Sequence, residues 1–123
     1  MRKIRLAAVL ASSLAVLLAP ARASAHAMLK SAAPAVGSTV QIAPTSVDLT
    51  FSSSVEPEFS TIVVQSADGV RVDKNDTHLV ADDARRLSVT VGSVPVGRYT
   101  VIWHATSTDT HKTQGSFTFT VAR

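Results

Sequence analysis

The feature that most constrains the fold is an alternation of apolar and polar residues in short segments. The longest segment is Arg98–Ala105, which places Tyr99, Val101 and Trp103 on one face of an extended strand. Similar segments are found at residues 47–52, 61–65, 87–91 and 115–121, and a shorter one lies near residues 78–80. This pattern predicts an all-β antiparallel sandwich of about seven strands.

Turn-forming residues separate these segments, and no stretch shows a helical period. The turns are expected at residues 34–37, 43–45, 68–69, 74–76 and 95–97. The charged run Asp82–Arg86 carries both signs and is interpreted as a solvated loop. The segment lengths and spacing indicate a single domain.

The N-terminal residues have the three-part pattern of a secretory signal peptide. Residues 1–5 are cationic, residues 6–19 are uncharged and apolar, and Ala23-Ser24-Ala25 fits a small-residue cleavage site. An apolar run this short does not comfortably span roughly 30 Å of hydrocarbon. We therefore expect a signal peptide over residues 1–25 and a soluble exported domain over residues 26–123. A cut after Ala23 is the alternative.

The composition excludes several kinds of site. The chain has no cysteine, which rules out thiolate metal sites, thiol catalysis and disulfides. Of its 12 lysines and arginines, four precede residue 26, whereas all 9 acidic residues follow it. The net charge of the mature domain is therefore about −1, and no basic cluster suited to nucleic acid remains.

Asp109 and His111 are the first candidate metal ligands. They are two residues apart, so in an extended segment their side chains point to the same side. A carboxylate and an imidazole placed in this way form half of a metal site. The alternative is a polar turn between two strands, with both side chains solvated.

His26 adds two further nitrogens if cleavage makes it the first residue. Its α-amine and ring Nδ1 can then chelate one cation, and Asp109 and His111 would complete a set of nitrogen and oxygen donors. Such a set suits Cu(II), whereas Zn(II) prefers a tetrahedron. A thioether Cu(I) site is not expected, because Met28 is the one methionine after residue 25. The alternative is that His26 is an accidental first residue on a frayed end.

The remaining ionisable candidates are weaker. His78 lies in a charged turn and is expected to be exposed, and His104 is expected to point outward from its strand, with a role as a second ligand as the alternative. Glu56 and Glu58 form a carboxylate pair, but Pro57 between them indicates a loop. No nucleophilic triad and no glycine-rich phosphate loop is found.

Together these residues resemble the CopC family of periplasmic copper-binding proteins over nearly the whole mature length. The most specific feature is the run W-x-x-x-S-x-D-x-H-x-x-x-G, from Trp103 to Gly115, combined with an N-terminal histidine. The resemblance also includes residues 31–38, the strand-like segment 47–52, residues 97–103 and residues 115–119.

The resemblance implies a Greek-key β-sandwich similar to cupredoxins and immunoglobulin-like domains. It implies Cu(II) bound by the amine and ring of His26, with Asp109 and His111. It also implies a role in copper resistance or uptake, often beside a membrane protein called CopD. Two features depart from the family: there is no methionine-rich Cu(I) loop, and Ser53 stands where some members carry a glutamate. An acidic neighbour would then have to come from Glu56 or Glu58.

We therefore expect an exported, periplasmic and monomeric protein that sequesters or delivers Cu(II) and has no enzymatic activity. One rival is a copper-dependent oxidative enzyme, because an N-terminal histidine also clasps copper in polysaccharide-cleaving enzymes. A second rival is a β-sandwich interaction module without metal.

Overall fold

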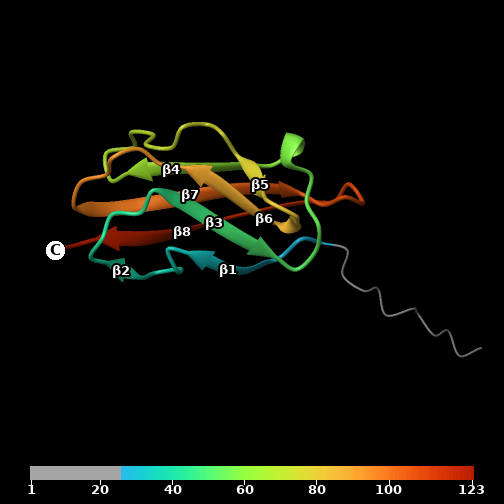
Figure 1. Ribbon diagram of the computed structural model, residues 1–123, viewed down its shortest axis with the longest axis horizontal. Coiled ribbons are helices and arrows are strands. Elements are labelled where there is room, and N and C mark those ends of the chain that lie inside the picture. Colours follow the sequence, from blue (N-terminus) through green and yellow to red (C-terminus); the bar gives the residue numbers. More distant parts are fainter. Residues whose placement is uncertain (1–25) are drawn as a thin grey trace, which may run out of the picture.

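Two four-stranded sheets pack on each other in the computed structural model, which describes residues 26–123 (Figure 1). The expected signal peptide, residues 1–25, lies outside the described residues. The elements are β1 (Leu29–Ala33), β2 (Thr39–Val40), β3 (Ser46–Phe51), the 3₁₀ helix η1 (Pro57–Phe59), β4 (Thr61–Ser66), β5 (His78–Val80), β6 (Asp83–Thr90), β7 (Gly97–Thr106) and β8 (Lys112–Val121). Within residues 26–123, no helix is long and apolar enough to cross a membrane.

The strand order confirms the all-β sandwich. One sheet has the order β1-β3-β6-β5 and the other β2-β8-β7-β4. Neighbouring strands are antiparallel, except that β2 runs parallel to β8. Only β5–β6 and β7–β8 are successive strands that pair within one sheet, and the other connections cross between the sheets, as expected of a Greek key.

The alternation seen in the sequence forms the core between the two sheets. Val47, Leu49 and Phe51 of β3 are buried, and so are Tyr99, Val101 and Trp103 of β7. The Tyr99 hydroxyl donates to the Pro95 carbonyl oxygen at 2.6 Å, so this buried phenol keeps a hydrogen bond of the kind found in tyrosine corners.

The charged run Asp82–Arg86 was wrongly interpreted as a loop. Residues 83–86 form the first half of β6, where Arg86 pairs with Thr50 of β3. Main-chain pairing with β3 holds this segment extended, and most of its side chains lie at the surface. Backbone pairing has therefore overridden the composition of the segment.

Gly115 is required by the aromatic residue opposite it. It pairs with Trp103 across β7 and β8, and the Trp103 ring packs edge-on against Phe51 at a centroid distance of 5.3 Å. A Cβ at position 115 would lie 2.7 Å from Cζ2 of this ring. The indole therefore covers a strand position that has room for no side chain.

We expect Gly115→Ala to lower the free energy of unfolding by about 1–3 kcal/mol, because the buried indole must shift to admit the methyl group. Chemical denaturation measures this change. Gly92→Ala is the matched control, since a Cβ there would lie 3.7 Å from its nearest neighbour, the Val72 carbonyl oxygen. Equal effects of the two substitutions would contradict the steric explanation.

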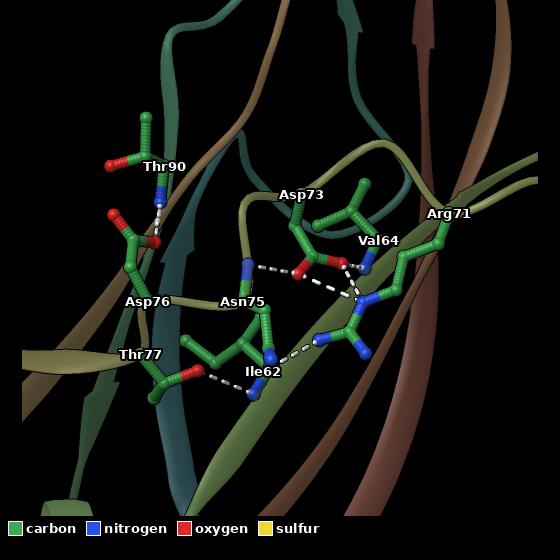
Figure 2. A network of polar contacts seen from close by, with 8 residues as sticks. All are labelled: Ile62, Val64, Arg71, Asp73, Asn75, Asp76, Thr77 and Thr90. Atoms are coloured by element: carbon green, nitrogen blue, oxygen red, sulfur yellow. Dashed lines mark hydrogen bonds and ion pairs between the residues drawn. The ribbon is translucent and has the colours of Figure 1, made fainter.

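A polar network holds the segment after β4 against both sheets (Figure 2). The buried Asp73 carboxylate accepts hydrogen bonds from the Val64 N–H at 2.8 Å, from the Asn75 N–H at 2.9 Å and from Arg71 Nε at 2.8 Å. Asp76 accepts from the Thr90 N–H at the end of β6 at 2.8 Å. Burial alone would raise the pKa of Asp73, but the bonds from Arg71 and the two backbone amides hold this pKa below its usual value.

We expect Asp73→Asn to lower the free energy of unfolding at pH 7 by about 1.5–3 kcal/mol, because charge-assisted hydrogen bonds are lost. A lowered pKa stabilises the fold fully above the unfolded value of about 3.9, and this contribution disappears as the pH falls through the folded value. The difference between wild type and variant should therefore shrink below about pH 4. Thermal unfolding across pH 2–7 tests this, with the exposed Asp68→Asn as the control; a gap constant down to pH 2 would contradict it.

Candidate metal centre

The predicted metal ligands come together at one end of the sandwich. The β7–β8 turn, the last residue of β3 and the start of β1 lie at this end, and the C-terminus lies at the other (Figure 1). His26 lies just before β1, and Asp109 and His111 lie in the turn between β7 and β8. The three residues are therefore at the same end of the sandwich.

The turn after β7 is organised by Ser107, which is 2% exposed. Its hydroxyl donates to Asp109 Oδ1 and accepts from the His111 N–H at 3.2 Å. The Ser107 N–H also donates to the His111 carbonyl oxygen at 2.9 Å. Thr110, with φ of 77°, reverses the chain between the two candidate ligands. The S-x-D-x-H run is thus a closed turn in which one buried serine sets the positions of both side chains.

Asp109 and His111 interact directly. Oδ1 of Asp109 lies 3.3 Å from Nδ1 of His111, and both side chains are about half exposed. The Ser107 hydroxyl, and after it His111, hold the pKa of Asp109 below its usual value, so the carboxylate is charged at neutral pH. Both the contact with the Ser107 hydroxyl and the contact with the His111 ring are made by Oδ1 of Asp109.

His26 lies next to His111. The two ring centroids are 4.7 Å apart, with an edge-on angle of 66° between the planes. The following residue, Ala27, is 0% exposed and belongs to the hydrophobic core. This buried neighbour fixes the chain directly after His26.

The donors present fit a cupric ion in kind, with two imidazoles, one carboxylate and no sulfur. In the structure as it stands, no group of three or more His, Asp or Glu side chains in the described range could hold a metal ion. The fourth donor of the predicted set is a backbone group. In the full chain the α-nitrogen of His26 is an amide joined to Ala25, and only cleavage there turns it into an amine.

The weaker candidates form no hydrogen bond or ion pair with these three side chains within residues 26–123. His104 is exposed on β7, opposite Thr61 and Gln114, and His78 is exposed with Nδ1 2.6 Å from the Asp76 carbonyl oxygen, so both orientations are confirmed. Glu56 contributes its backbone N–H to the Thr106 carbonyl oxygen at 2.8 Å.

Glu58 is exposed in η1. The Ser53 hydroxyl is buried and has no hydrogen-bond partner among residues 26–123. Within residues 26–123, the ion pair of the His111 ring is with Asp109 and involves neither glutamate.

Sequence reasoning overlooked the hydroxyl residues around the site. Ser107 carried a signal, since it stands two residues before Asp109 in the S-x-D-x-H run. Ser52 and Thr113 contact the segment from His26 to Met28. Ser52 ends the segment 47–52 that resembles the family, but nothing in the sequence indicated this contact, and Thr113 had no signal beyond its place on a strand.

Known proteins resemble this chain in sequence and in fold. Residues 29–122 match the CopC domain. Protein YobA of Escherichia coli (strain K12) is 36% identical over 98 residues, which are 79% of each chain. The copper transport protein CutJ of Bacillus subtilis (strain 168) is 30% identical over 105 residues, 85% of this chain and 19% of CutJ.

A crystal structure extends the comparison to the fold. PcoC, a methionine-rich copper resistance protein from Escherichia coli, superposes with a TM-score of 0.71 at 31% identity, covering 79% of this chain and 99% of PcoC. The strand arrangement of this chain is therefore similar to that of a copper resistance protein.

Proposed function

This chain belongs to the CopC family, and we propose from that premise that it is an exported protein that binds Cu(II) in copper resistance. The ligands in this proposal are the α-amine and ring of His26, the carboxylate of Asp109 and the ring of His111. One observation carries the proposal: the His26 and His111 rings lie 4.7 Å apart beside a charged carboxylate. Metal–nitrogen bonds of about 2.0 Å make this spacing compatible with both rings on one ion.

The choice of Cu(II) rests on the donors. Amine, imidazole and carboxylate groups favour Cu(II) among divalent first-row metals, and Zn(II) would require a more tetrahedral set. PcoC is a methionine-rich protein, whereas this chain has only Met1 and Met28. A store of soft thioether ligands for Cu(I) is therefore not part of the proposal.

A binding role is favoured over an oxidative enzyme by the surface of the domain. All six aromatic residues lie in the described part of the chain, and five of them are buried in the core. Phe59 alone is exposed. A flat aromatic platform for a polysaccharide is thus lacking on residues 26–123, and we expect no peroxide production by the copper-loaded protein with a reductant beyond that of free copper.

Two further observations support a proposed place of action and a proposed partner. The signal-peptide pattern of residues 1–25 favours export to the periplasm. CutJ, a copper transport protein, contains the matching region as 19% of its length. We infer that the CopC-like domain acts as a monomer and passes copper to or from an inner-membrane copper transport protein of the CopD type.

The deciding experiment is an isothermal titration of the mature protein, residues 26–123, with Cu(II). We expect one ion per chain and a Kd well below micromolar, and Zn(II) should bind more weakly. No binding tighter than micromolar would instead support the interaction module without metal.

A further inference from the structure

Two hydroxyl side chains hold the segment that carries His26. The Ser52 hydroxyl accepts from the Met28 N–H at 2.9 Å and donates to the His26 carbonyl oxygen at 3.2 Å. The Ser52 N–H also donates to the Met28 carbonyl oxygen at 2.8 Å. The Thr113 hydroxyl donates to the Ala27 carbonyl oxygen at 2.8 Å.

These contacts come from both sheets. Ser52 directly follows β3 in one sheet, and Thr113 lies on β8 in the other. Between them, the buried side chain of Ala27 occupies the core. The segment 26–28 is therefore held from three directions at the end of the sandwich that carries the β7–β8 turn (Figure 1).

None of the atoms held in this way is a proposed copper donor. The hydroxyls contact the carbonyl oxygens of His26 and Ala27 and the N–H of Met28, whereas the donors are the α-nitrogen and the ring of His26. Cleavage before His26 changes none of the held atoms. The contacts can therefore persist in the mature protein while the new amine stays free for the ion.

We propose that Ser52 and Thr113 are positioning residues for copper, which fix the N-terminal residue within reach of His111. This inference rests on the proposed function. A chain end without such contacts would lose backbone freedom when the ion binds, and that loss would weaken binding. The two hydroxyls remove this freedom during folding instead, before the ion arrives.

The test compares Cu(II) affinity in single variants of the mature protein. We expect Ser52→Ala to weaken binding about tenfold, the equivalent of ordering one residue on binding. Thr113→Val should weaken binding to a similar extent, and Ser52→Thr, which keeps a hydroxyl, should restore most of the affinity. The electron paramagnetic resonance spectrum of Ser52→Ala should show a second Cu(II) species with fewer nitrogen ligands.

Two controls separate positioning from a general loss of structure. Ser116→Ala removes an exposed β8 hydroxyl that forms no hydrogen bond with residues 26–28, and it should leave the affinity unchanged. In a background that lacks both His26 donors, made by His26→Ala with one residue added in front, Ser52→Ala should have no further effect. An equal loss in that background would show that Ser52 acts through the fold and would overturn the proposal.

Failure of this inference can be distinguished from failure of the proposed function. If wild type binds Cu(II) tightly and Ser52→Ala binds equally well with the same spectrum, the positioning role alone is rejected. If wild type binds no Cu(II), both proposals are rejected.

Discussion

A protein with one extra residue in front of His26 will bind Cu(II) roughly a hundredfold more weakly than the protein that begins at His26. The added residue converts the α-amine into an amide, which is a poor donor near neutral pH, and it breaks the chelate between amine and ring. Removing a residue that only hydrogen-bonds to a metal ligand lowers metal affinity about 10–100-fold. Here a ligand itself is lost. Isothermal titration of the two proteins with Cu(II) measures the difference.

The control for this comparison adds one residue after Arg123, at the opposite end of the sandwich (Figure 1). That protein should bind Cu(II) like wild type. Both extended proteins should unfold at the wild-type temperature without metal, because Ala27 and its contacts are unchanged. Equal affinity of the protein extended before His26 would reject the amine as a ligand.

The strands that could be predicted are those with one buried and one exposed face. Residues 98–105 alternate because β7 packs one side on the core, and the same reason applies to β3 and β8. β2 has only two residues, and β1 has a register shift between Leu29 and Ser31, so neither has a clear period. The first half of β6 is set by its partner β3, and a pattern within one segment does not contain that information.

The candidate site was predictable to the extent that it is local in sequence. Asp109 and His111 are separated by one residue, and a single turn brings them together through Ser107. The contact between Thr113 and Ala27 joins residues 86 positions apart, and it depends on the packing of both sheets. For that reason the sequence could suggest His26 as a ligand but could not show what holds it beside His111.

The second large effect is expected from His111→Ala, which should weaken Cu(II) binding by roughly a hundredfold while leaving the fold intact. The contacts that close the turn use the backbone of this residue: its N–H bonds to the Ser107 hydroxyl at 3.2 Å, and its carbonyl oxygen accepts from the Ser107 N–H at 2.9 Å. The ring itself is about half exposed and stabilises no core contact. Removing the ring therefore removes one nitrogen ligand. The loss of Cu(II) affinity should be at least as large as the loss of about 10–100-fold seen when a residue that only hydrogen-bonds to a ligand is removed.

His104→Ala is the matched control, since it removes an exposed imidazole from the same hairpin. Cu(II) titration and thermal unfolding of both variants separate ligand loss from misfolding. We expect His104→Ala to match wild type in both measurements, and His111→Ala to match it only in unfolding without metal. If His111→Ala binds Cu(II) as tightly as wild type and His104→Ala, the ion is not bound at the β7–β8 turn, and the assignment of His111 and Asp109 is wrong.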